Sequence, residues 1–192
     1  MDRSNIFKTE LNYIKNEDYK ASAKKLLDLV PDYFFEIPAA STGKYHPSFA
    51  QGEGGLIRHT KAALRIANEL LSLEYMNKEY TEREKDLLLI AILFHDTIKL
   101  GNPREKYTRF DHPLLAASFI KDNQSITTFK NEDIKFLERT ISSHMGQWNK
   151  NSYSDIILPK PSDKYEFFVH ECDYLASRNF MDIKFNEKSE IL

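Results

Sequence analysis

The helical class of this chain follows most directly from residues 81–96, which read TEREKDLLLIAILFHD. Thr81 can cap a helix while Glu84 reaches back to the capping amide, which is the pattern of a capping box. The apolar run over residues 87–94 is typical of a buried helix and is far too short to span a bilayer. We expect this helix to continue to about Lys99, because a glycine and a proline follow shortly afterwards.

Further helices are expected where apolar residues recur at helical spacing and where capping residues precede them. They lie over residues 1–30 as one or two helices, from about Leu56, from Asp111 to about Lys121, from about Asn131 to Gly146, and from Ser162 or Asp163 to about Phe180. No segment shows a convincing strand alternation. The sequence therefore predicts an all-α fold, a compact bundle of about six to eight helices, with loops over residues 41–55 and 146–161.

Composition places the chain among globular proteins and narrows its partners. Its 192 residues are 41% hydrophobic and 29% charged, and the formal net charge of -2 provides no overall basic field for nucleic acid. The single cysteine, Cys172, excludes an intrachain disulfide framework and fits a reducing cytoplasm. The first residues lack the basic stretch and apolar segment of a signal peptide, so we expect a cytoplasmic protein without a membrane partner.

The histidines are placed in a way that suggests a metal site. Five of the six lie at the inner face or end of an expected helix, or beside an acidic residue. The sharpest feature is the pair His95-Asp96, because ionisable groups that follow an apolar helix are costly to bury unless something compensates the carboxylate. A divalent cation would do so, although an isolated His-Asp pair is more often a hydrogen-bonded helix end. The six are His46, His59, His95, His112, His144 and His170.

Three segments resemble, in order along the chain, the metal motifs of the HD superfamily of phosphohydrolases. They are residues 54–60 (GGLIRHT), 93–99 (LFHDTIK) and 170–175 (HECDYL). In that family a first histidine, a His-Asp doublet and a distant aspartate bind one metal ion. The resemblance therefore implies four metal ligands in this chain, which are His59, His95, Asp96 and Asp173.

The same resemblance implies roles for residues around these four. The family's lysine three residues after the doublet corresponds to Lys99, which would stabilise negative charge on a phosphate, whereas Thr97-Ile98 stand where many members have a glycine before that lysine. Some members hold a second metal ion with two more histidines. His112 and His144 are placed for that role, with Asp96 as the bridging and catalytic carboxylate.

The resemblance is strongest to the HD domain of bacterial 3′–5′ exoribonucleases, which also carries a segment like Ser142–Gly146 (SSHMG). It covers residues 54–178, about two thirds of the chain. We therefore expect residues 1–192 to form a single HD domain, with residues 1–50 as a helical N-terminal extension packed on the core.

The chemistry of the implied ligands agrees with a transition metal rather than magnesium. Four histidines and two aspartates suit one or two ions of Mn²⁺, Fe²⁺, Co²⁺, Ni²⁺ or Zn²⁺, whereas Mg²⁺ prefers oxygen ligands. His170 lies one turn before Asp173, so we expect it to orient a ligand rather than to bind metal. The candidates for a substrate-binding rim are Lys44, Tyr45, Arg58, Lys61, Arg109 and Arg178, with His46 beside them.

These residues predict a metal-dependent phosphohydrolase or phosphodiesterase that uses metal-activated water. Its substrate would be a nucleotide, a cyclic nucleotide, another phosphorylated small molecule or a short single-stranded nucleic acid, with a base stacking on Tyr45, Tyr107 or Trp148. Two alternatives remain open at this point. A di-iron oxygenase of HD type has a similar order of ligands, and a non-catalytic module could bind a nucleotide without turnover.

Overall fold

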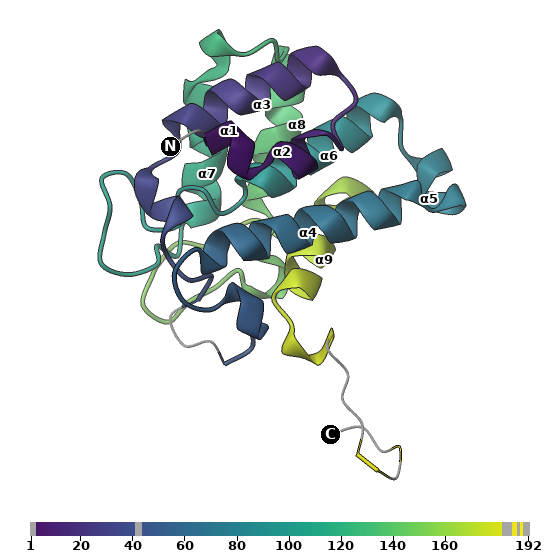
Figure 1. Cartoon of the computed structure of the whole chain (residues 1–192). Coiled ribbons are helices and arrows are strands. Elements are labelled where there is room, and N and C mark those ends of the chain that lie inside the picture. Colours follow the sequence, from purple (N-terminus) through teal and green to yellow (C-terminus); the bar gives the residue numbers. More distant parts are fainter. Residues whose placement is uncertain (1–2, 41–43, 182–185, 188, 190–192) are drawn as a thin grey trace.

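The computed structural model describes residues 3–40, 44–181, 186–187 and 189. Within them the chain forms nine α-helices and five short 3-10 helices and no β-strand, which confirms the all-α class (Figure 1). The count exceeds six to eight because the first 30 residues form three helices instead of one or two. A six-residue helix, α5 (Glu74–Glu79), also follows α4. In the described part of the chain, no helix has both the length and the apolar character needed to cross a membrane.

The centre of the bundle is α6 (Glu82–Phe94), which begins with the expected capping box between Thr81 and Glu84. Every residue from Lys85 to Phe94 is buried, because α4, α8 and α9 pack around this helix. A helix that is apolar on all sides is stable only when it is enclosed in this way. The apolar run in the sequence therefore sets which helix becomes the core.

Four longer helices surround or extend this core. They are α4 (Gly55–Ser72), α7 (His112–Asp122), α8 (Asn131–Ser142) and α9 (Lys164–Ala176). Helix α4 packs on α6 and α9, and α7 packs on α8 (Figure 1). The Asp163 side chain caps α9 by accepting hydrogen bonds from two backbone amides. Each of these helices carries a candidate site residue at or near one of its ends or on its buried side.

The N-terminal helices are α1 (Arg3–Ile6), α2 (Lys8–Leu11) and α3 (Glu17–Leu29). Helix α2 packs against α4, and α3 packs against α1. The buried carboxylate of Asp86, on α6, accepts hydrogen bonds from the backbone amides of Lys15 and Asn16, at 2.8 and 2.9 Å. These contacts connect the first helices to the middle of the bundle.

Three helices end earlier than the sequence predicts, and one of them is α8, which stops at Ser142 and not near Gly146. Helix α6 stops at Phe94 rather than near Lys99, because the following residues form three-residue turns such as Thr97 N–H to Phe94 C=O. Helix α9 stops at Ala176 and not at Phe180, which lies in the 3-10 helix η5 (Asn179–Met181). The expected loop over 41–55 contains η2 (Ser48–Ala50), and residues 41–43 of it lie outside the described residues. The early end of α6 frees the side chains that follow to point in new directions.

Candidate metal centre

Six buried or nearly buried side chains from five parts of the chain meet inside the bundle. One lies on α4, two directly follow α6, one begins α7, one follows α8 and one lies on α9. Five have an exposed fraction of 4% or less, and the sixth is about one-fifth exposed. We call them the six-residue centre, which consists of His59, His95, Asp96, His112, His144 and Asp173. The sequence had selected these same residues.

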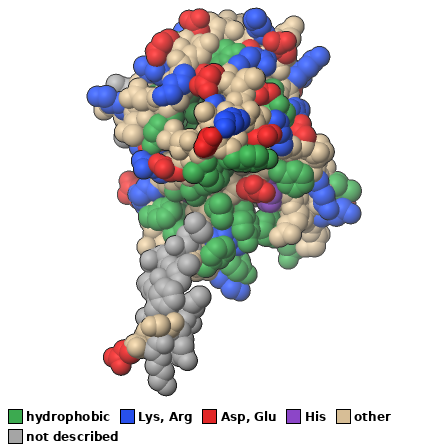
Figure 2. Space-filling view, turned by 90° about the vertical axis from the view of Figure 1, so that its right-hand side faces the viewer, with side chains coloured by type: hydrophobic (Ala, Val, Ile, Leu, Met, Phe, Trp, Pro, Cys, Tyr) green, Lys and Arg blue, Asp and Glu red, His purple; other side chains and the backbone are tan. Residues whose placement is uncertain are grey.

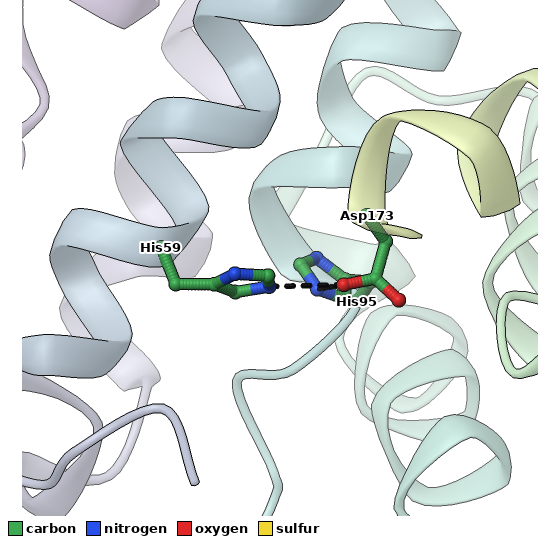
Figure 3. A group of neighbouring side chains, drawn as sticks. All are labelled: His59, His95 and Asp173. Atoms are coloured by element: carbon green, nitrogen blue, oxygen red, sulfur yellow. Dashed lines mark hydrogen bonds and ion pairs between the residues drawn. The ribbon is translucent and has the colours of Figure 1, made fainter. Parts of the chain in front are cut away.

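One half of the centre joins α4, α6 and α9. The Asp173 Oδ1 atom lies 2.9 Å from His59 Nε2 and 3.4 Å from His95 Nε2. Figure 3 shows the two imidazole rings and the carboxylate pointing toward one another from three different elements. Residues 114 positions apart in the chain thereby present ligand atoms to one point.

The other half is built around Asp96. Its Oδ1 atom lies 3.1 Å from His112 Nε2 and 3.9 Å from His144 Nε2, while Oδ2 lies 3.6 Å from His95 Nε2. The Lys99 ammonium group is 2.5 Å from Oδ2. Asp96 is therefore the carboxylate that both sides of the centre share.

The orientation of three imidazole rings is fixed by the backbone. His95 Nδ1 lies 2.7 Å from the carbonyl oxygen of Ile92, and His112 and His144 make equivalent bonds to carbonyls three residues earlier, at 2.7 and 2.8 Å. A carbonyl oxygen can only accept, so each Nδ1 carries a proton, and the lone pair of each ring in its neutral form is at Nε2. The Nε2 atoms of His112 and His144 are 3.3 Å apart. Two facing lone pairs at this distance repel each other unless a proton or a cation lies between them.

The electrostatics hold the two carboxylates and His144 in the forms that metal ligands need, whereas His95 is neutral only once it has released its extra proton. Burial opposes ionisation of both carboxylates, but other groups outweigh it and hold both pKa values well below the usual range. These groups are Lys99, His95 and His112 for Asp96, and His59 and His95 for Asp173. Burial lowers the pKa of His144 to about 3, so this ring is neutral at pH 7. For His95 the nearby carboxylates outweigh burial and raise its pKa. Ionised carboxylates and a neutral imidazole are the forms that bind a cation.

A divalent cation fits the polar atoms that are left without partners. Among the described residues, three buried side-chain atoms lack a hydrogen bond, and two of them, His95 Nε2 and Asp96 Oδ1, belong to the centre's inner set of atoms. An unpaired buried polar group costs about 1–3 kcal/mol, and a bound cation would remove that cost. The set of four imidazoles and two carboxylates suits a first-row transition metal.

His170 lies outside the six-residue centre and contacts the backbone of one of its members. Its Nδ1 atom lies 2.7 Å from the carbonyl oxygen of His144. Gly146, with φ of +57°, passes directly over the His170 ring, and a Cβ at this position would come less than 3.0 Å from three ring atoms. Only glycine allows the chain after α8 to approach the ring this closely.

We therefore expect Gly146→Ala to weaken metal binding as well as stability. The added methyl group must displace His170, which in turn releases the backbone of His144. The loss of metal affinity should be about 10- to 100-fold, the range typical of residues that orient a ligand, and can be measured by metal titration alongside thermal unfolding. The matched control is Gly52→Ala, because Gly52 also has a positive φ, +66°, but nothing lies within 4 Å of its Cβ position. Equal metal affinity in the two variants would contradict this role of His170.

The loop that carries Lys99 is held by a residue that the sequence did not single out. The Tyr33 hydroxyl, on η1 (Asp32–Phe35), accepts a hydrogen bond from the Leu100 amide at 3.2 Å and donates one to the Gly101 carbonyl at 2.9 Å. Burial raises the pKa of Tyr33 to about 12. No sequence signal pointed to it, because a buried tyrosine looks like any other core residue before its hydroxyl partner is known.

The structure does not bring three of the proposed rim residues to the centre. The Arg58 guanidinium donates to backbone carbonyls of residues 49, 51 and 53 and so holds the loop before α4. Lys61 contacts Glu10 and the Ile6 carbonyl on the N-terminal helices. Arg109 pairs with Asp111 and Glu105, and only its backbone reaches the site, where its carbonyl oxygen contacts His112. These arginine and lysine side chains already form hydrogen bonds and ion pairs within the protein.

The remaining rim residues lie together near the C-terminal end of α9. Lys44 and Tyr45 are exposed, and the Arg178 guanidinium carbon lies 5.6 Å from the Tyr45 ring centre. His46, which the sequence placed only in the rim, packs edge-on against the His59 ring with centres 5.6 Å apart. Burial lowers the pKa of His46 to about 4, so the ring is neutral at pH 7 and can accept or donate a hydrogen bond.

Comparison with protein families gives one match. The family model described as HD domain matches residues 56–178, a span that begins on α4 and ends just after α9 and includes the whole six-residue centre. No curated protein and no solved structure matches the chain.

Proposed function

The chain belongs to the HD domain family, and from this membership we propose that it hydrolyses a phosphoester bond with a divalent metal held by the six-residue centre. HD domains generally act as metal-dependent hydrolases, and the clusters of His59, His95 and Asp173 and of His95, Asp96 and His144 are compatible with metal binding. The observation that carries the proposal is the set of Nε2 lone pairs that backbone carbonyls turn toward Asp96.

The ligands divide into two groups that meet where His95 Nε2 lies 3.6 Å from Asp96 Oδ2. His59, His95 and Asp173 would hold one ion, and Asp96 with His112 and His144 would complete a second position. A bound divalent cation supplies Lewis-acid chemistry, which makes water a better nucleophile at neutral pH and stabilises charge on phosphoryl oxygens. The donor set favours Mn²⁺, Fe²⁺, Co²⁺, Ni²⁺ or Zn²⁺ over Mg²⁺.

The protein's own residues would orient the reactants. Asp96 accepts a hydrogen bond from the attacking water, and its ionised state at neutral pH suits that role. The Lys99 ammonium group, next to Asp96, would move to a phosphoryl oxygen as negative charge develops there. Water forms the new bond to phosphorus, the ester bond breaks, and the departing alcohol oxygen takes up a proton. The buried position of the six-residue centre limits access of other water molecules.

We further propose that the substrate is a nucleotide, a cyclic nucleotide or a short oligonucleotide. The resemblance of residues 54–178 to the HD domain of bacterial 3′–5′ exoribonucleases supports this class, as does the aromatic and cationic rim around Tyr45 and Arg178.

The test is a substrate panel assayed with each metal in turn. Protein stripped with a chelator and reloaded with Mn²⁺, Co²⁺, Ni²⁺ or Zn²⁺ is expected to release p-nitrophenol from bis(p-nitrophenyl) phosphate, and nucleotides from a short oligonucleotide. Turnover with Mn²⁺ in the absence of oxygen would separate hydrolysis from the oxygenase alternative. Nucleotide binding without turnover under every metal would instead favour a non-catalytic module.

A further inference from the structure

A cluster of aromatic rings surrounds one arginine at the end of α9. The Arg178 guanidinium carbon lies 4.5 Å from the centre of the Tyr174 ring, 5.4 Å from that of Trp148 and 5.6 Å from that of Tyr45. The Trp148 and Tyr174 rings are stacked, with an angle of 15° between their planes. We call these four residues the Arg178 cluster.

Arg178 differs from the other arginines in its hydrogen bonding. Each of the other seven arginine side chains has a carboxylate or backbone carbonyl partner. Among the described residues Arg178 has neither, and its one side-chain bond is from Nε to the Ser177 hydroxyl at 3.1 Å. Aromatic faces stabilise the charge of a guanidinium group but do not accept its planar N–H bonds. Within the described part of the chain, four N–H donors therefore remain for a ligand, and their planar arrangement matches the oxygen atoms of a phosphate.

The cluster borders the six-residue centre on two sides. His170, which holds the backbone of His144, has its ring centre 6.1 Å from that of Trp148 and 6.2 Å from that of Tyr174. On the other side Tyr45 directly precedes His46, which packs on His59. A ligand that extends from the centre would therefore meet the cluster.

The aromatic members leave ring surface free. Trp148 is 40% exposed and Tyr45 is 54% exposed. Exposed rings beside a cation suit a flat, negatively charged ligand such as a nucleotide. Any of the nucleobases can stack on an aromatic ring, and the cation attracts the phosphate. Figure 2 shows one face of the molecule, on which hydrophobic side chains gather around a histidine and an acidic group. The Arg178 guanidinium, which lies among these rings, is the group that would select an anion.

We propose that the Arg178 cluster is a subsite for one nucleotide unit of the substrate. Arg178 binds a phosphate group other than the one that is hydrolysed, and the exposed Tyr45 ring stacks on the base. This inference rests on the proposed function and narrows it to a phosphodiester that joins at least two nucleotide units.

The only tryptophan of the chain, Trp148, lies in the cluster and reports on it directly. In metal-free protein, AMP is expected to quench the tryptophan fluorescence and to bind at least about tenfold more tightly than adenosine, because it adds charge-assisted hydrogen bonds to the stacking. Arg178→Gln should reduce the affinity for AMP to that for adenosine and leave adenosine binding unchanged. Tyr45→Leu, a change at an exposed position, should weaken both ligands.

The control is Arg65→Gln, which removes the same charge from an exposed ion pair with Glu69 on α4 and should change neither affinity. Equal affinities of the native protein for AMP and adenosine would overturn the subsite. So would an Arg178→Gln variant that melts like the native protein and binds AMP as tightly. If Arg178→Gln does not fold, the Tyr45→Leu variant tests the subsite instead. Unchanged affinity for AMP in that variant would show that the base does not stack on Tyr45 and would overturn the subsite.

Turnover separates failure of the subsite from failure of the proposed function. If AMP quenches the fluorescence as expected but no ester is hydrolysed with any metal, the proposed subsite stands and the proposed function is wrong. The reverse outcome is hydrolysis in which Arg178→Gln raises the KM for the 5′-(p-nitrophenyl phosphate) of thymidine 3′-phosphate, which carries a second phosphate group, no more than that for bis(p-nitrophenyl) phosphate. That result would retain the function and remove the subsite.

Discussion

Asp96→Asn is expected to lower kcat/KM for phosphoester hydrolysis by at least about a thousandfold, because loss of a single electrostatic group in an active site already costs about a hundred- to a thousandfold. The Asp96 carboxylate is the group that connects the two halves of the centre, with Oδ1 toward His112 and Oδ2 toward His95. A neutral carboxamide has nearly the same shape, but it cannot balance a divalent charge and cannot bridge two cations. Steady-state kinetics with reloaded metal and bis(p-nitrophenyl) phosphate measure the effect.

The matched control is Asp86→Asn, also on a buried side chain. Asp86 is 2% exposed, and its carboxylate accepts the Lys15 and Asn16 amides on the side of the N-terminal helices. This change should lower the free energy of unfolding and leave kcat/KM of the folded protein near the native value. Phosphoester hydrolysis that survives Asp96→Asn would remove the proposed mechanism.

The second large effect is expected on thermal stability. A metal ion at about 100 times its dissociation constant should add about 2.7 kcal/mol to the free energy of unfolding. For a chain of this size that corresponds to a rise in Tm of roughly 5–11 °C. The stabilisation arises because the ion binds only where His59 on α4 and Asp173 on α9 have come together, which the unfolded chain does not provide. Scanning calorimetry with and without Mn²⁺, Co²⁺ or Zn²⁺ measures the shift.

Variants at the two ends of this contact distinguish a metal site from ordinary packing. His59→Gln and Asp173→Asn should each remove most of the metal-induced rise, and the double variant should lose little more than either single one, because both act on one bound ion. His46→Gln is the control, since its ring touches His59 but lies outside the six-residue centre. A full rise in Tm for Asp173→Asn would show that the ion binds elsewhere.

The order and identity of the helices could be predicted from the sequence because their signals are local. The apolar run over residues 87–94 can be buried only inside a bundle, and the Thr81 and Asp163 side chains cap helices where they were expected to. The six residues of the centre could be selected for a similar reason. Each stands on the inner face or at the end of its own helix, and the order of the motifs matches that of a known family.

Only the tertiary structure decided how these residues act together. Helical spacing places His144 on the inner side of its own segment. It does not say that the Ile141 carbonyl accepts a hydrogen bond from Nδ1 or that Nε2 faces His112. It also does not say which long side chains are already paired. Lys61 turns to the N-terminal helices, whereas Arg178 has no carboxylate or carbonyl partner among the described residues.

The physical reason is the range of the forces involved. Burial and capping depend on residues within one or two helical turns, so a single sequence specifies them. Hydrogen bonds, ion pairs and metal geometry depend on distances of about 2–4 Å between atoms far apart in the chain, and these distances exist only once the helices have packed.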